Sequence, residues 1–242
     1  MELEWYVLVA AAAAGYLLGS VSFARVIGRI VAPGEDFTRV ELSGEGQQGT
    51  LEFDLVTATT VATKLGPKAG LLTSLFDLLK VLLPALAFRL LFPGAPYFLA
   101  AAAFGVVGHN WPVYYGFRGG AGLSAALGGL LVVDWLGVLV LPLAGMSLGL
   151  AVFRDLFAAS ALWVVLMLPW VWLRTGDPWH LAYAGIVCVS FFLASVPTLK
   201  RYLKLRREDP AAYWAIAESS HMGRGMLRIG RLFGMRRKSE DR

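Results

Sequence analysis

Apolar runs long enough to cross a lipid bilayer recur along this chain, and few charged residues interrupt them. A membrane-spanning helix needs roughly 17–25 mostly apolar residues. Runs of this kind extend from Trp5 to Phe23, from Leu71 to Phe92 and from His180 to Leu199. Only 16% of the residues are charged, well below the roughly 25% of an average soluble domain. Because a soluble core cannot bury so much apolar surface, the sequence predicts an all-α, polytopic helical membrane protein.

Seven spans are expected in total. The other four are Tyr97–Asn110, Leu123–Val133, Leu136–Phe153 and a run that ends near Trp172. Since Leu123–Val133 is too short to cross the bilayer alone, it is either a short helix or part of a longer, bent helix with Leu136–Phe153.

The distribution of cations predicts the orientation of these spans. The basic tail and one set of turns hold most of the Lys and Arg residues, whereas only Arg89 and Arg174 fall in the opposite turns. Because cytoplasmic loops carry the excess of Lys and Arg, we expect the N-terminus outside and the C-terminus in the cytoplasm. A secretory signal would begin with positive charge, but Glu2 and Glu4 precede the first run, so we expect an uncleaved first span.

The net charge of +5 comes from the tail, since twelve of the 22 Lys and Arg residues follow Leu199. We therefore expect a membrane domain over residues 1–199 and a basic cytoplasmic tail over residues 200–242. Helical spacing separates two faces in this tail, an apolar one with Met222, Met226, Ile229 and Phe233 and a basic one with Arg224, Arg228 and Arg231. Such a helix suits an anionic lipid surface better than nucleic acid. A partly disordered basic tail is the alternative.

Residues 108–122, GHNWPVYYGFRGGAG, combine a histidine, an asparagine, an arginine and five glycines between two apolar runs. Glycine lets the backbone approach a ligand closely, and a cation beside exposed N–H groups is a common way to hold an anion such as phosphate. The segment therefore predicts an anion-binding loop at the membrane edge. A glycine-rich turn between buried helices, with Arg118 as an ordinary cytoplasmic anchor, is the alternative.

Two charged residues inside the second run also indicate a polar site. Asp77 and Lys80 are three residues apart and so share one helix face. Each would cost about 2.5–3.5 kcal/mol at the centre of the bilayer. We expect the pair to face the site, although a purely structural ion pair would satisfy the same pattern. His109 could likewise be a packing residue, but its neighbours favour a hydrogen bond to a substrate.

The stretch GHNWPVYYGFRGGAGLSA resembles the second signature motif of the PlsY family, the bacterial membrane acyltransferases that acylate glycerol 3-phosphate from acyl phosphate. That motif reads roughly G-H-x-x-P-x-F-x-x-F-K-G-G-K-G-V-A-T. Arg118 replaces its first lysine with another cation, and Ala121 replaces its second lysine. The family's first helix carries a Gly-Ser pair and a further small hydroxyl residue, which Gly19, Ser20 and Ser22 match. These small residues could also serve only close helix packing.

The remaining family motifs are matched in part. Around residues 31–66 the flanks resemble the family's first, phosphate-binding motif, with Arg39 at its start and Thr60 in place of its last asparagine. The centre of that loop is longer and more acidic than the motif. RDLFAASA keeps Arg154 and Ser160 of the third motif, and the closing segment at residues 194–198 lacks the family's histidine and asparagine.

The resemblance implies a set of roles. The implied catalytic residues are His109, Asn110 and Ser160. The implied phosphate ligands are Arg39, Lys80, Arg118, Gly119, Gly120 and Gly122. The implied supporting residues are Ser20, Thr60 and Asp77. It also implies glycerol 3-phosphate and acyl phosphate as substrates, an apolar groove between spans for the acyl chain, and a bacterial inner membrane as the location.

Neither a metal nor another cofactor is expected, because the chain holds a single cysteine and no His/Cys cluster. The H-x-x-x-x-D dyad of soluble acyltransferases and a Gly-x-Ser-x-Gly elbow are also absent from the sequence. Two other functions stay open. The altered motifs would suit a non-catalytic relative that binds lipid phosphate or a partner, and the composition would suit a small anion or lipid transporter.

Overall fold

The structure is a computed structural model that describes residues 3–35, 37, 40–43, 50–53, 56–219 and 221–232. The first half contains α1 (Trp5–Gly19), α2 (Phe23–Val31), β1 (Val40–Ser43), β2 (Thr50–Phe53), α3 (Ala58–Leu65), α4 (Pro67–Leu91) and α5 (Tyr97–Asn110). The second half contains the 3-10 turn η1 (Val113–Tyr115), α6 (Leu123–Val133), α7 (Trp135–Ala151), α8 (Leu156–Thr175), α9 (Pro178–Glu208), α10 (Pro210–Ser219) and α11 (His221–Leu232).

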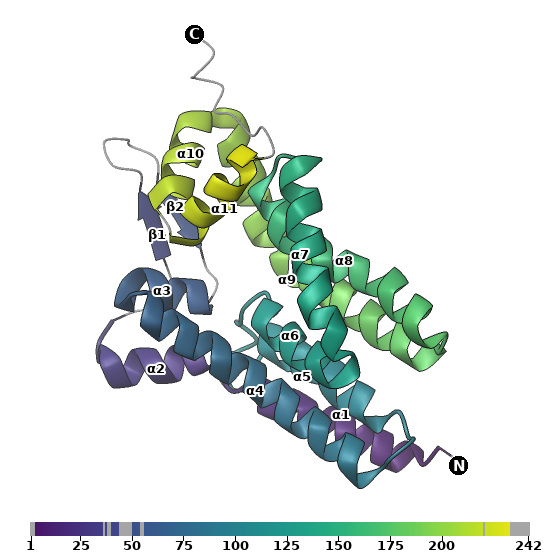
Figure 1. Cartoon of the computed structure of the whole chain (residues 1–242). Helices are drawn as coiled ribbons and strands as arrows, with labels where there is room; N and C mark the ends of the chain where they lie inside the picture. Colours follow the sequence, from purple (N-terminus) through teal and green to yellow (C-terminus); the bar gives the residue numbers. More distant parts are fainter. Residues whose placement is uncertain are drawn as a thin grey trace.

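The long helices form two neighbouring groups (Figure 1). α1 and α4 pack on α5, α6 packs on α4, and α7, α8 and α9 form the other group, joined to the first through α5 and α9. The main core lies where the groups meet and is built from aliphatic and aromatic residues, among them Val81, Val106, Leu130, Val164 and Val187. The N-terminus lies at one end of the bundle, and β1, β2, α10 and α11 lie at the other.

The helical membrane architecture predicted from the apolar runs is confirmed. Five helical segments in the described part of the chain are long and apolar enough to cross a membrane, namely Trp5–Val31, Pro67–Leu91, Trp135–Phe153, Leu156–Thr175 and Pro178–Glu208. α6 is a separate short helix, because Asp134 ends it and caps the N-terminus of α7. This settles the alternative between a short helix and a bent one.

Three local features differ from the expected layout. The first apolar run is broken, since α1 ends at Gly19 and α2 begins at Phe23. The region expected as a polar loop holds a short antiparallel hairpin, in which Val40 pairs with Phe53 and Ser43 with Thr50. α9 continues to Glu208 instead of ending near Leu199, so the expected domain boundary falls inside a helix.

Glycines allow α1 and α5 to touch along their backbones. A β-carbon built on Gly15 would overlap the carbonyl of Ala101, and one on Gly19 would overlap the carbonyl of Gly105. Gly108 faces the carbonyl of Tyr16 in the same way. Small residues at such an interface are the usual means of close approach between membrane helices. This contact fixes the C-terminal end of α5, which carries His109.

We expect Gly15→Ala to lower the free energy of unfolding by about 1–3 kcal/mol, because the added methyl group overpacks a backbone contact. The measurement is the thermal midpoint of the purified protein in detergent. Gly185→Ala is the matched control, since a β-carbon there meets nothing within 4 Å and alanine is the better helix former. Equal midpoints for the two variants would contradict the close packing of α1 and α5.

A polar cluster holds the turn between α6 and α7 and the C-terminal end of α8 together. Asp134 accepts hydrogen bonds from the indole of Trp170 (2.8 Å), the guanidinium of Arg174 (3.0 Å) and the amide of Leu136 (3.1 Å). Burial raises the pKa of Asp134, but the hydrogen bonds from Arg174 and Trp170 outweigh burial and hold the pKa below its ordinary value. The turn between α6 and α7 is thus fixed to the end of α8.

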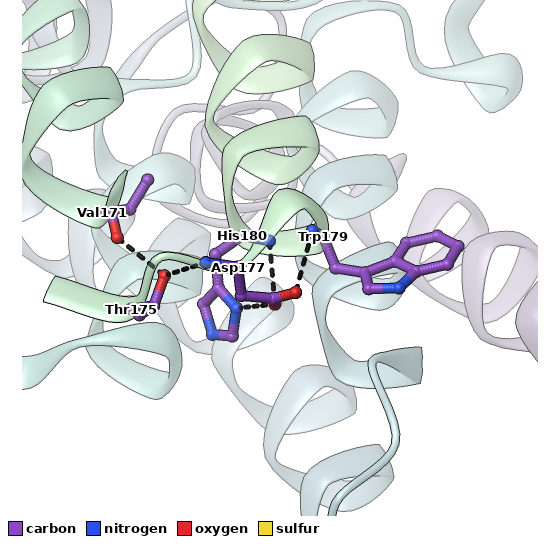
Figure 2. Close-up of polar contacts among 5 residues, drawn as sticks. All are labelled: Val171, Thr175, Asp177, Trp179 and His180. Atoms are coloured by element: carbon purple, nitrogen blue, oxygen red, sulfur yellow. Dashed lines mark hydrogen bonds and ion pairs between the residues drawn. The ribbon is translucent and has the colours of Figure 1, made fainter. Parts of the chain in front are cut away.

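The turn into α9 is capped in a similar way (Figure 2). The carboxylate of Asp177 accepts hydrogen bonds from the amides of Trp179 (3.3 Å) and His180 (3.4 Å). It also contacts Nδ1 of the His180 ring. Thr175 links this turn back to the carbonyl of Val171 at 2.7 Å. The indole of Trp179 points away from these contacts, as expected for an aromatic residue at a membrane interface.

Candidate active site

Three ionisable side chains meet where the middle of α4 faces the C-terminal end of α5. Lys80 Nζ lies 2.8 Å from Asp77 Oδ1, and Nδ1 of His109 lies 3.5 Å from the same oxygen. All three side chains are less than 10% exposed. A buried charge needs a partner, and each charge here has one. Because Asp77 faces Nδ1, the carboxylate favours the tautomer that carries its proton there and leaves Nε2 as an acceptor.

The break between α1 and α2 also supplies a hydrogen-bond acceptor for Lys80. Its ammonium donates to the carbonyl of Val21 at 2.6 Å. The buried Ser20 lies beside this break, where its hydroxyl donates to the carbonyl of Tyr16 (2.8 Å) and accepts from the amide of Val113 (3.4 Å). An ammonium has three N–H donors. The ion pair with Asp77 and the hydrogen bond to Val21 occupy at most two of these donors, so a third can bind an anion.

The glycine-rich loop packs directly on the end of α5. The amide of Gly120 donates to the carbonyl of His109 at 3.3 Å. A β-carbon built on Gly120 would lie 2.5 Å from Nε2 of His109, so the imidazole stands between Asp77 and this loop. Gly122 has φ +80° and faces Oδ1 of Asn110. Both polar atoms of the Asn110 side chain are buried and lack a hydrogen-bond partner in the described part of the chain, so they can bind a ligand.

The segment after β2 reaches the same loop from the other side. The amide of Val56 donates to the carbonyl of Gly119 at 3.4 Å, and Thr57 packs against Gly120. The buried Thr60 forms a reciprocal capping box with Thr57 at the start of α3. Two segments that are far apart in the sequence, the end of the first motif and the centre of the second, are thus in contact.

The structure does not gather all of the predicted site residues. The Arg118 side chain is exposed, and no hydrogen bond or ion pair of its guanidinium is found among the described residues. The hydroxyl of Ser160 donates to the carbonyl of Phe157, within its own helix, at 2.8 Å. In the described part of the chain no hydrogen bond or ion pair joins Ser160 to His109. Arg39 lies outside the described residues.

Sequence reasoning missed one cation at this loop. Arg25, in the first turn of α2, donates through Nη2 to the carbonyl of Arg118 at 2.7 Å, and its guanidinium lies 4.6 Å from the ring centroid of Tyr115. Arg25 therefore ties the glycine-rich loop to the break after α1. A sequence signal was present, since Arg25 follows the Gly-Ser pair by a little more than one helical turn.

An apolar groove of about 290 Å³ has Lys80 in its wall. It runs between α4 and the segment that joins α1 to α2. Its other lining residues are Leu18, Val21, Phe23, Phe76, Leu79, Leu83 and Pro84. Lys80 is thus the one charged group on an apolar wall, and its position suits a ligand with an apolar chain and an anionic head.

Comparison with known sequences connects this geometry to a protein family. The sequence model of the glycerol-3-phosphate acyltransferase family matches residues 9–205. The chain belongs to this family. A glycerol-3-phosphate acyltransferase of Thioalkalivibrio sulfidiphilus (strain HL-EbGR7) is 32% identical over 197 residues, which cover 81% of this chain and 89% of the relative. One of Maricaulis maris (strain MCS10) is 31% identical over 198 residues, covering 82% and 85%.

Solved structures agree with this membership in the glycerol-3-phosphate acyltransferase family. The crystal structure of PlsY, an integral membrane glycerol 3-phosphate acyltransferase, in its glycerol 3-phosphate form has a TM-score of 0.67 and 26% identity to this chain. The match covers 82% of this chain and 93% of that one. The lysophosphatidic acid form gives a TM-score of 0.66 at 25% identity. The family match ends at residue 205, so α10 and α11 lie beyond it.

Proposed function

We propose that this protein transfers an acyl group from an acyl phosphate to glycerol 3-phosphate, giving lysophosphatidic acid and inorganic phosphate. Family membership and the two PlsY structures support this reaction. The observation that carries it is the position of His109, whose imidazole stands between Asp77 and Gly120. The His109 base, next to the carboxylate of Asp77, therefore faces the glycine-rich loop. A phosphate and a reacting hydroxyl can bind together there.

Phosphate binding is assigned to groups on both sides of this loop. Lys80 offers its third N–H donor, and the backbone of Gly119, Gly120 and Gly122 offers a surface without side chains. Arg118 lies on the exposed side of the same loop, where it can close over a phosphate that arrives from the cytoplasm. Arg39 is proposed as an additional phosphate ligand because it matches the start of the family's first motif. Ser20, Thr60 and Asp77 hold these ligands in place through their buried contacts.

An acyl phosphate is already activated, so the protein mainly has to position the reactants and stabilise charge. The glycerol hydroxyl oxygen attacks the acyl carbonyl carbon, its proton passes to Nε2 of His109, and the bond from that carbon to the phosphate oxygen breaks. Asn110 orients the hydroxyl with its unpartnered amide. Ser160 is proposed as a further orienting group from its place in the third motif. The groove beside Leu79 and Leu83 takes the acyl chain.

The same proposal includes the membrane topology. Seven helices, α1 and α4 to α9, are assigned as spans of a bacterial inner membrane, with the N-terminus outside and the C-terminus in the cytoplasm. α6 has only 11 residues and is counted because this orientation requires the chain to return across the membrane between α5 and α7. The positive-inside rule supports this orientation. Arg89 and Arg174 lie at the end that holds Asp134, whereas Arg118 precedes α6 and Arg154 joins α7 to α8, at the opposite ends of these helices. The relatives reported above are bacterial.

The basic tail from residue 200 to 242 is proposed to contact anionic lipid through the exposed cations of α11. Arg224 and Arg228 are exposed, whereas Leu227 is buried and Ile229 packs on Leu150. The apolar face of α11 therefore contacts the protein and does not insert into the bilayer. Its contribution to lipid binding is electrostatic, and we expect it to weaken as the salt concentration rises.

Acylation of glycerol 3-phosphate by the purified protein tests the function, with palmitoyl phosphate as the donor. We expect Arg118→Ala to raise the KM for glycerol 3-phosphate about 10- to 100-fold, since a hydrogen bond to a charged group contributes about 1.5–3 kcal/mol. Arg207→Ala, which removes an exposed cation from the end of α9, is the matched control.

Two results would contradict the acyltransferase. A protein that is inert with acyl phosphate, acyl-CoA and acyl carrier protein donors, yet binds anionic vesicles, would be a non-catalytic relative. Movement of phosphate or of a lipid across sealed vesicles without any acylation would indicate a transporter.

A further inference from the structure

The two C-terminal helices are fixed to the inner end of the bundle by a hydrogen-bonded chain of side chains. Asp155, at the N-terminus of α8, accepts from the hydroxyl of Tyr202 at 2.8 Å and also pairs with Arg206. The hydroxyl of Tyr202 lies 2.8 Å from that of Tyr213 in α10. Tyr213 is 5% exposed, and burial raises its pKa. This chain runs from α8 through α9 into α10.

Apolar contacts hold the same helices. Trp214 of α10 and Ile229 of α11 pack against a small core formed by Leu150 of α7 and Ala159 of α8. The rings of Tyr202 and Tyr213 meet edge to face with their centroids 5.3 Å apart. α10 and α11 are therefore docked on the protein, although they follow the last residue that matches the family.

One of the docked helices, α10, touches the hairpin that interrupts the first motif. β1 lies against α10, and β2 lies against α9. Figure 1 shows this hairpin between α3 on one side and α10 and α11 on the other. The two added parts of the chain, the hairpin and the C-terminal helices, are thus neighbours although they are far apart in the sequence.

The hairpin leads straight into the candidate site. Phe37, three residues before β1, and Val56, three residues after β2, are both buried in one small cluster with Ala24, Ile27 and Val61. Three residues of extended chain reach at most about 10 Å, so the hairpin cannot move far without moving Val56. Val56 and Thr57 are the residues that contact Gly119 and Gly120.

We propose that α10 and α11 position the glycine-rich loop through the hairpin, with Tyr213 as the positioning residue that keeps them docked. Tyr213 does not touch the substrate. Its contacts with Tyr202 hold α10 against α9 and beside β1, and the hairpin then keeps the segment from Val56 to Thr60 against Gly119 and Gly120. The kinetic consequence of this coupling rests on the acyltransferase function proposed above, whereas the structural coupling does not.

Hydrogen exchange measured by mass spectrometry on the full-length protein tests the coupling. We expect Tyr213→Ala to speed exchange about fivefold in residues 56–66 and 116–122, because substitutions along a coupled path typically change local equilibria by such factors. The KM for glycerol 3-phosphate should rise by a similar factor while kcat changes less than about twofold. Tyr213→Phe keeps the ring contacts and should restore both values to within about twofold of wild type.

Ala211→Gln is the matched control, since residue 211 is exposed on the same helix and the substitution should leave exchange unchanged. Faster exchange in α10 and α11 with residues 56–66 unchanged would overturn the proposal. Equal acceleration in α1 and α5 would also overturn it, since it would mean general loosening. Exchange does not depend on catalysis, so an inert wild-type protein would refute the acyltransferase function and leave the coupling intact.

Discussion

Replacing Lys80 with methionine should reduce acyl transfer by about 100- to 1,000-fold, the usual cost of removing one charged group that stabilises a transition state. The same change should lower the free energy of unfolding by about 3–5 kcal/mol, because Asp77 would become a buried charge without its closest partner. The side chain of Asp77 is 3% exposed, so water cannot take the place of the ammonium. Initial rates with glycerol 3-phosphate and thermal midpoints measure the two effects.

The double variant Asp77→Asn/Lys80→Met separates stability from activity. Removing both charges should restore most of the lost stability, since a neutral pair of similar volume needs no counter-ion. Activity should stay low, because the N–H donor that Lys80 offers to the phosphate is then missing. Lys68→Met, on the exposed first turn of the same helix, should leave both quantities unchanged. If the double variant regained wild-type rates, Lys80 would be a structural partner of Asp77 and nothing more.

Features that depend on local sequence were predictable. Apolar runs and polar turns gave the positions of the long helices, because in a membrane the backbone must satisfy its hydrogen bonds within each helix. The spacing of Asp77 and Lys80 placed them on one helix face, and the structure pairs them. The anion-binding interpretation of residues 108–122 rested on glycines, whose lack of side chains is visible in the sequence itself.

Features that depend on contacts between distant segments were not predictable. The break after Gly19 directs the carbonyl of Val21 toward Lys80, yet nothing in the apolar pattern of residues 5–23 marks it. Arg118 was expected to lie within the pocket, but its side chain is exposed. Its neighbour Phe117 has φ +60°, a conformation that no propensity of phenylalanine indicates. The extension of α9 to Glu208 likewise depends on packing, since the residues after Leu199 are mostly charged.

Adding a single methyl group at Gly120 should reduce kcat about 100-fold while changing the thermal stability little. The new β-carbon would lie 2.5 Å from Nε2 of His109, so the imidazole or the loop must shift. Displacing a catalytic group by about 1 Å can cost about a factor of 100 in rate. Gly120 itself is buried, but residues 116–118 of the loop are exposed and can adjust, so the cost should appear in activity. Steady-state kinetics of Gly120→Ala with glycerol 3-phosphate measure it.

A substitution elsewhere in the loop shows whether the contact with His109 is responsible. Gly116 has φ +60° and open space around its α-carbon, and asparagine tolerates this conformation. Gly116→Asn should therefore keep near wild-type kcat, although it adds a larger side chain than Gly120→Ala does. Because both variants alter the same loop, a general loss of loop order would affect them alike. Only a requirement for free space beside Nε2 of His109 predicts a large loss at residue 120 and none at residue 116. Similar losses at both positions would remove the main support for His109 as the base.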